Sequence, residues 1–151
     1  MSLRLCGLLG LLASACLWAG AKGSIEVVRD PDVLEFAQRI ELFYDELEGR
    51  SINVFHTFQD PVFRTFFLHE EGFVDYYASL ASQLRAAHFR HGRPVRVEVR
   101  EFQFENPERA TVDVTLVGEH LRGLLFWDVR VQRTDTWRRR RSVWVLSPER
   151  L

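Results

Sequence analysis

Apolar residues recur at steps of three and four along the first third of the chain, the period of a helix with one buried face. Asp30 suits the helix start as an N-cap. Pro31 fits the first helical position, and Asp32 lies near the positive end of the helix dipole. Gly49 is a natural stop. We therefore predict one long helix between these signals, with a buried stripe of Val33, Phe36, Ala37, Ile40, Phe43, Tyr44 and Leu47.

The middle of the chain predicts shorter helical pieces followed by a second long helix. Residues 51–58 have the pattern of a short helix, and Asp60 with Pro61 is typical of the start of another turn, which reaches Phe67. A longer helical pattern covers residues 73–89 before residues 91–94 break it. Its apolar side consists of Phe73, Tyr76, Tyr77, Leu80, Leu84 and Ala87.

From Val95 onward the hydrophobic period changes from helical spacing to strict alternation, which is typical of strands. The alternation slips by one residue at Glu101 and then resumes with Phe102 and Phe104. A one-residue change of phase within a strand is what a β-bulge produces, and bulges bend sheets. We therefore predict a long, bent first strand.

Three further strands follow the first. The predicted inward positions of the next two are Val112, Val114 and Leu116, and then Leu125, Trp127, Val129 and Val131. We predict that residues 135–141 form a polar connection and that residues 142–146 form the closing strand. Helices followed by consecutive strands indicate an α+β fold, in which the N-terminal helices pack on one face of a curved, antiparallel, four-stranded sheet.

Composition fits a single domain over residues 24–151. The chain has 151 residues, of which 46% are hydrophobic and 13% aromatic, enough for one core but not for two. The net charge of −1 indicates no polyanionic partner, although the helical half is acidic and the strand half is basic. We expect no nucleic-acid partner.

The N-terminus has the layout of an export signal. Arg4 precedes an uncharged run over residues 5–21, which then ends in small residues. This run is at the lower limit for spanning a bilayer, so we predict a removable signal peptide, residues 1–21, rather than a permanent anchor. The predicted location is the periplasm or another part of a bacterial envelope.

Two cleavage sites remain open. Residues 13–16, Ala-Ser-Ala-Cys, resemble the lipobox of bacterial lipoproteins, which implies a signal over residues 1–15 and a lipid attached to Cys16. Residues 19–21, Ala-Gly-Ala, form an ordinary site whose cleavage leaves Lys22 first. Cys6 and Cys16 are the only cysteines, so a chain cut after Ala21 has neither a disulfide nor a catalytic thiol.

Several segments together resemble the nuclear transport factor 2-like superfamily. These are residues 43–50 (FYDELEGR), 60–64 (DPVFR), 95–102 (VRVEVREF), 110–116 (ATVDVTL), 129–133 (VRVQR) and 142–146 (SVWVL). The superfamily has a cone-shaped, cystatin-like fold that ketosteroid isomerases and SnoaL-like cyclases share with many exported domains. The resemblance covers almost the whole mature chain and implies a cone-shaped roll.

The resemblance also implies where an active site would lie. Enzymes of this superfamily place an acid inside the cone as a general base, where an apolar wall raises its pKa. Asp128 is the carboxylate within the apolar run of residues 124–129, but alternation places it on the wetter face, opposite Val129. Asp113 alternates with core residues and is expected to point outward.

No residue stands out as clearly catalytic. Tyr44 and Tyr77 are candidate hydrogen-bond donors to a ligand, although a tyrosine on a helix stripe usually buries its ring and gives its hydroxyl to the backbone. The candidate ligand pocket consists of Tyr44, His56, Tyr77 and Trp127. We expect His56 to be a half-buried structural residue. The remaining histidines lack the spacing of a metal site, so neither a metal nor a cofactor is expected.

Four consecutive arginines occupy residues 138–141, where the superfamily often has an acidic residue and a glycine. They have the chemistry to contact phosphate or lipid headgroups. The interpretation we favour is a solvated hairpin that protects a strand edge from pairing with other chains.

Two functional hypotheses follow. The first is a non-catalytic exported domain that binds an apolar small molecule or another envelope protein through its cone or sheet face, with a dimer through the sheet face as one option. The second is a small cofactor-free isomerase, dehydratase or cyclase with an Asp base such as Asp128 and a tyrosine as oxyanion donor. A pocket that encloses both groups favours the enzyme, and a cone filled by Phe and Trp favours binding.

Overall fold

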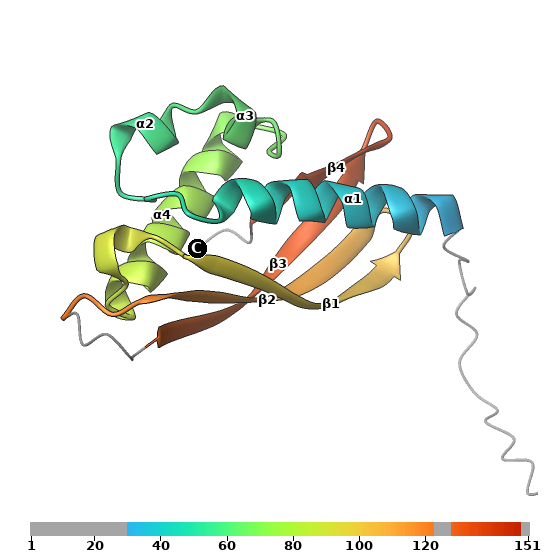
Figure 1. Ribbon diagram of the computed structural model, residues 1–151. Helices are drawn as coiled ribbons and strands as arrows, with labels where there is room; N and C mark the ends of the chain where they lie inside the picture. The colour runs from blue at the N-terminus through green and yellow to red at the C-terminus, as the bar shows by residue number, and fades with distance from the viewer. Residues whose placement is uncertain (1–29, 123–127, 149–151) are drawn as a thin grey trace, which may run out of the picture.

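Helices precede a curved, open, antiparallel sheet in the computed structural model, which describes residues 30–122 and 128–148 (Figure 1). The helices are α1 (Asp30–Leu47), α2 (Phe55–Phe58), α3 (Pro61–Arg64), α4 (Glu70–Ala86) and the short 3-10 helix η1 (Arg90–Gly92). The strands are β1 (Arg96–Asn106), β2 (Arg109–Glu119), β3 (Asp128–Arg140) and β4 (Val143–Leu146), in the spatial order β1-β2-β3-β4. The predicted α+β class and four-stranded antiparallel sheet are confirmed.

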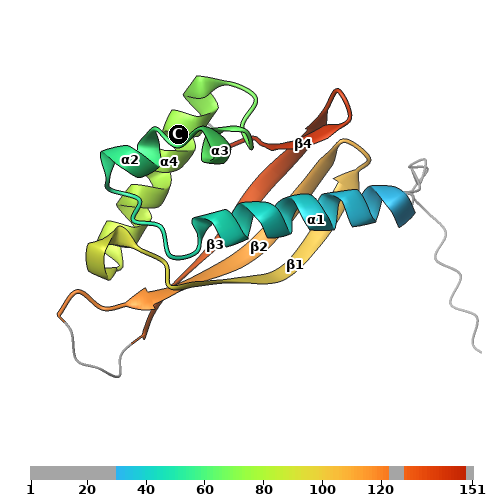
Figure 2. The ribbon, with the colours of Figure 1, turned by 45° about the horizontal axis from the view of Figure 1, so that its top comes forward.

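α1 lies across the inner face of the sheet (Figure 2). Its predicted stripe is buried, because Phe36, Phe43 and Leu47 are 0% exposed. The helix ends at Leu47, and Gly49 two residues later adopts the left-handed φ of +75° and donates its N–H to the carbonyl of Pro94 at 2.8 Å. This bond joins the end of α1 to the start of the sheet.

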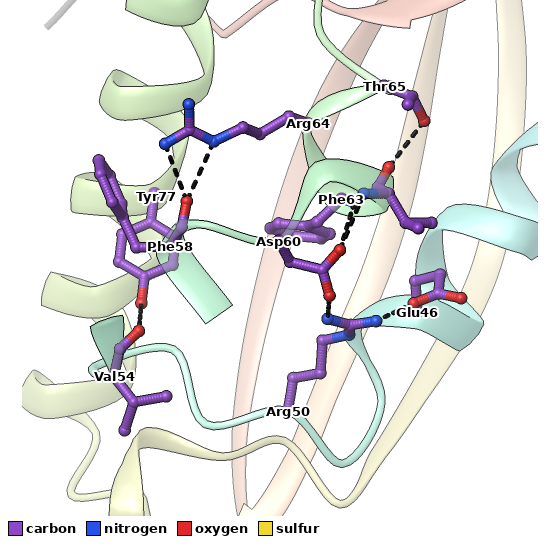
Figure 3. Close-up of polar contacts among 10 residues, drawn as sticks. Glu46, Arg50, Val54, Phe58, Asp60, Phe63, Arg64, Thr65 and Tyr77 are labelled. Carbon is purple, nitrogen blue, oxygen red and sulfur yellow. Dashed lines mark hydrogen bonds and ion pairs between the residues drawn. The ribbon is translucent and has the colours of Figure 1, made fainter. Parts of the chain in front are cut away.

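Short, strongly hydrogen-bonded turns connect α1 to α4. Asp60 caps α3 as predicted, because its Oδ1 accepts the backbone N–H of Val62 at 2.8 Å. Arg50 bridges this cap to α1 through ion pairs with Asp60 and Glu46 (Figure 3). The Arg50 hydrogen bond lowers the pKa of Asp60. The carboxylate therefore stays charged and holds α3 against the end of α1.

Pairing between the strands confirms the predicted bulge. The register of β1 on β2 shifts between Val99 and Glu101, so Arg100 is the extra residue. β3 and β4 are joined by a tight two-residue turn, in which Arg141 and Ser142 have φ values of 49° and 66°. Two positive φ values in succession match a type I′ turn, which suits the twist of a hairpin.

One expectation about the sheet was wrong. Residues 135–140 are not a polar connection, because β3 continues to Arg140. This half of β3 pairs with β2 from Asp135 to Arg138, and with β4 from Trp137 to Arg140. Main-chain pairing on one or both sides therefore keeps a polar sequence in strand conformation.

Aromatic side chains fill the space between the sheet and the helices. The ring of Phe43 lies at the centre of this core, with ring centroids 5.3 Å from Phe63, 5.7 Å from Tyr76 and 5.5 Å from Trp137. Trp144, on the last strand, is 1% exposed and therefore faces inward as the alternation predicts. The inside of the fold is a packed aromatic core.

Candidate functional site

A single carboxylate is buried in the described part of the chain, and it belongs to Asp135 on β3. Its side chain is 1% exposed. The two-residue period of β3 positions it, because Val131 packs against the core, Trp137 is fully buried, and Asp135 shares their face. A buried charge is costly unless other groups compensate it, so its surroundings decide what it can do.

Three hydrogen bonds and one further ion-pair contact compensate the Asp135 charge. The hydroxyls of Tyr44 and Tyr76 donate to Oδ2 at 2.8 and 3.1 Å. Nε and Nη2 of Arg133 lie 2.8 and 2.7 Å from Oδ1. Nη1 of Arg133 donates to Gln83 Oε1 at 3.2 Å. We call these five residues the Asp135 cluster; they connect α1, α4 and β3.

Electrostatics keep the donors of this cluster in their donating forms. Burial raises the pKa of Tyr44 and Tyr76 well above the usual tyrosine range, and the charge of Asp135 raises both further. Burial by itself would lower the pKa of Arg133, but the oxygens of Tyr76 and Asp135 outweigh it, and the net shift is upward. Both phenols therefore stay protonated and the guanidinium stays charged.

This arrangement is suited to structure rather than to proton transfer. A general base must come within hydrogen-bond distance of a substrate proton. Oδ2 already accepts two hydrogen bonds, Oδ1 accepts one and contacts Arg133 Nη2, and the side chain is only 1% exposed. The cluster therefore fixes the positions of α1 and α4 on the sheet, as a fully satisfied buried network does.

A surface groove begins beside the cluster, between α4 and β3. Its first part has a volume of about 340 Å³ and lies between Asp75, Ser79 and Gln83 of α4 and Thr134 and Thr136 of β3. A second part of about 240 Å³ continues towards β4, and Asp75, Leu146 and Pro148 line both parts. We call the two together the α4 groove. Its walls carry side chains of both charges.

The structure does not bring the proposed ligand-pocket residues together. Tyr44 points into the core towards Asp135, whereas the hydroxyl of Tyr77 donates to the carbonyl of Val54 at 3.2 Å (Figure 3). His56 is exposed, which corrects the expectation of a half-buried residue. The reason is that α2 is one short turn whose buried residue is Thr57. Trp127 lies outside the described residues, as does Cys16.

The two carboxylates considered from the sequence lie outside the core. Asp128 is exposed at the first position of β3, where it pairs with Glu119. Asp113 points outward as expected and accepts a hydrogen bond from Thr134 Oγ1. The predicted backbone partner holds for Tyr77, but for Tyr44 it was wrong, because the acceptor is a buried carboxylate.

Sequence reasoning missed Asp135 because it ended the third strand too early. The signal was present: the alternation of Val129 and Val131 continues through Arg133 and Asp135 to Trp137. All five odd-numbered positions are partly or fully buried. Extending the period of two would have placed the carboxylate on the core face.

The described residues contain no metal-site cluster and no membrane-spanning helix, and three comparisons with known proteins identify no family. Within residues 30–122 and 128–148, no three His, Cys, Asp or Glu side chains gather in the way a metal site requires. The helices in the same ranges are too short or too polar to cross a membrane. No protein-family model, curated protein or solved structure matches the chain. Kinship with the nuclear transport factor 2-like superfamily therefore stays a prediction from residue pattern.

Proposed function

We propose that this chain is an exported, non-catalytic domain that binds another protein of the bacterial envelope through the α4 groove. The observation that supports this most directly is the packed interior. Phe43, Phe63, Trp137 and Trp144 occupy the space in which a cone-shaped fold would hold an apolar ligand. Binding then uses the surface, where the α4 groove is lined by polar groups of α4 and β3 together with Leu146 and Pro148.

The edge of β3 favours an extended protein segment as the occupant. Ser147 N–H donates to the carbonyl of Thr136 at 2.9 Å, continuing the pairing of β4 with β3. At residues N-terminal to Thr136, β3 pairs with β2 on one side, and no described strand pairs with its other edge. In an antiparallel sheet every second residue directs its N–H and C=O to a given edge, so Gln132 and Thr134 follow Thr136 in facing this edge. An added strand would satisfy these groups.

Charge on the groove walls suits a polar segment. Asp75 and Glu105 contribute negative charge, and Arg109 and Arg133 contribute positive charge. Ser79 and Gln83 supply neutral donors and acceptors on α4. Glu105 and Arg109 pair with each other and Arg133 pairs with Asp135, so Asp75, Ser79 and Gln83 are the groups that a polar segment can engage.

Photocrosslinking in cells tests this proposal. A photoreactive phenylalanine analogue at Ser79 should give one crosslinked product of defined mass, and the same analogue at the exposed Gln38 on α1 serves as the control. Thr134→Pro removes an N–H at the open edge and should abolish the Ser79 product without unfolding the chain. Products of equal yield at both positions, or a Ser79 product that survives Thr134→Pro, would contradict docking at the groove.

Export and the absence of a small ligand have their own tests. If Cys16 is acylated, radiolabelled palmitate should be incorporated and Cys16→Ala should abolish the label; an unlabelled mature chain that begins at Lys22 would end the lipoprotein hypothesis. Native mass spectrometry should show the protein without a co-purifying small molecule. A stoichiometric apolar compound would instead support a ligand-binding cone.

The enzyme hypothesis is supported by one feature only, the convergence of Tyr44 and Tyr76 on Asp135. Both hydroxyls already donate to that carboxylate, so neither is free to stabilise an oxyanion. Asp128, the base considered from the sequence, is exposed. A bound small molecule in contact with Asp135 would favour the enzyme over the binding domain.

A further inference from the structure

The β3–β4 hairpin concentrates positive charge that no described acid neutralises. Arg138, Arg140 and Arg141 are exposed and make no ion pair with another described residue. Arg138 and Arg140 lie at the end of β3, and Arg141 lies in the type I′ turn that follows it. The fourth arginine of the run, Arg139, behaves differently.

Arg139 attaches the hairpin to the start of α1. Its Nη1 lies 2.8 Å from Asp32 Oδ1, and its Nη2 lies 3.2 Å from Glu35 Oε2. Its side chain is 24% exposed. Figures 1 and 2 both show the hairpin at the end of the molecule where the chain enters α1. The three exposed arginines are therefore held beside the point at which the N-terminal segment joins the domain.

The position of this end relative to a membrane follows from chain length. A lipid on Cys16 would leave residues 17–29 between the bilayer and α1. Even fully extended, this segment spans at most about 45 Å. The start of α1, beside which the hairpin lies, is then held within about 45 Å of the membrane surface.

Half of the six described acids around the hairpin are already engaged in ion pairs. Glu105 pairs with Arg109 at 3.0 Å, and the two acids of α1 pair with Arg139. Glu71 and Asp75 line the α4 groove together with Arg138 and Arg140, but no ion pair forms between them. Glu108, on the neighbouring hairpin, is exposed. Arg141, at the turn, does not line the groove with Glu71 and Asp75, so the tip itself ends in an arginine that has no ion pair with a described acid.

We propose that this hairpin binds the anionic phospholipid headgroups of the membrane on which the protein resides. Guanidinium groups bind phosphate through paired, charge-assisted hydrogen bonds. A basic patch beside a lipid anchor supplies the second of the two signals that stable membrane attachment requires. The inference rests on the proposed export to the envelope. Arg138 and Arg140 also line the second part of the α4 groove, so the first part, beside Ser79 and Thr134, is the part that remains for a protein partner.

Vesicle cosedimentation tests this inference with the chain that begins at Lys22, which contains every described residue and so the whole core. Vesicles of phosphatidylglycerol and phosphatidylcholine are compared with vesicles of phosphatidylcholine alone. Each arginine near an anionic surface contributes about fivefold to binding, so the triple variant Arg138→Gln, Arg140→Gln, Arg141→Gln should bind anionic vesicles about a hundredfold more weakly. Circular dichroism of the variant checks that it folds.

A matched control has the same change in net charge elsewhere. Arg85, Arg93 and Arg122 are also exposed, and none lies on the hairpin. Their replacement by glutamine should change binding by no more than about threefold. Equal losses in the two triple variants, or equal binding of the parent chain to both vesicle types, would overturn the proposal. Unchanged vesicle binding in the hairpin variant would also overturn the proposal, as expected if the hairpin binds an acidic protein instead of lipid headgroups.

The assay separates this inference from the proposed function. It uses no lipid anchor and no export step, so failure of vesicle binding leaves the palmitate and crosslinking results intact. Conversely, vesicle binding through the hairpin by a protein that carries no palmitate would support the membrane-binding surface and contradict only the lipoprotein hypothesis.

Discussion

Replacement of Asp135 by asparagine tests whether the cluster stabilises the fold as the geometry indicates. An asparagine has one acceptor oxygen and would direct an NH₂ group at donors, so it cannot keep the hydrogen bonds from Tyr44, Tyr76 and Arg133 together. The Arg133 side chain, only 10% exposed, would lose its buried counter-charge. Breaking a buried pair by removing one partner costs about 3–5 kcal/mol.

Urea denaturation followed by circular dichroism measures this cost. A domain of this size is stable by about 5–15 kcal/mol, so Asp135→Asn should remove a large share of the free energy of unfolding. With an m-value of about 2 kcal/mol/M, the urea midpoint should fall by about 2 M. Asp113→Asn is the matched control, because Asp113 faces outward and bonds only Thr134; its cost should stay within about 1 kcal/mol. Equal midpoints for the two variants would refute the buried pair.

Three further predictions concern the core, the sheet and the α3 cap. Trp144→Ala should lower the free energy of unfolding by about 3–5 kcal/mol because the side chain is 1% exposed; a neutral result would mean that β4 faces the other way. Gly118→Ala should lower the melting temperature, since a Cβ there would lie 2.4 Å from Phe89 Cδ1, and an unchanged value would contradict that close approach. Arg50 lowers the pKa of Asp60, so Asp60 adds stability above its unfolded pKa of about 3.9, and that stability is lost as the pH falls through the lower folded pKa. The stability gap between the parent and Asp60→Asn should therefore narrow from about pH 5 to about pH 3 in denaturation curves, and a gap that widens would reverse the assigned sign.

Local signals predicted the elements whose physics is local. The start of α1 and its end just before Gly49 follow from residues within one turn of each boundary. The bulge at Arg100 was visible as a one-residue slip in the alternation of β1. Caps, stops and bulges depend on backbone conformation and nearest neighbours, so a single sequence carries them.

Alternation along β3 could have placed Asp135 on the core face, but it could not have identified the partners of this carboxylate, because they are distant in sequence. Tyr44 lies 91 residues before Asp135, and Tyr76 lies 59 residues before it. The segment Arg133-Thr134-Asp135 has the composition of a polar loop. Its burial depends on helices that come much earlier in the sequence. The α4 groove was hidden for a related reason, since it depends on where the four-residue strand β4 stops along β3.

The Asp135 cluster and the α4 groove are physically one construction. Tyr76 and Gln83 belong to the cluster and also line the groove, so the hydrogen bonds that compensate Asp135 hold one groove wall against β3. A carboxylate in an aromatic core costs desolvation energy that an apolar residue would avoid. In exchange, the cluster fixes the orientation of α4. Its hydrogen bonds and the contact of two Arg133 nitrogens with Oδ1 allow one placement of this helix, whereas packed aromatic rings tolerate several. On this argument the buried acid acts on partner binding only through the position of α4, and the chemistry of recognition belongs to the polar groups that face the groove.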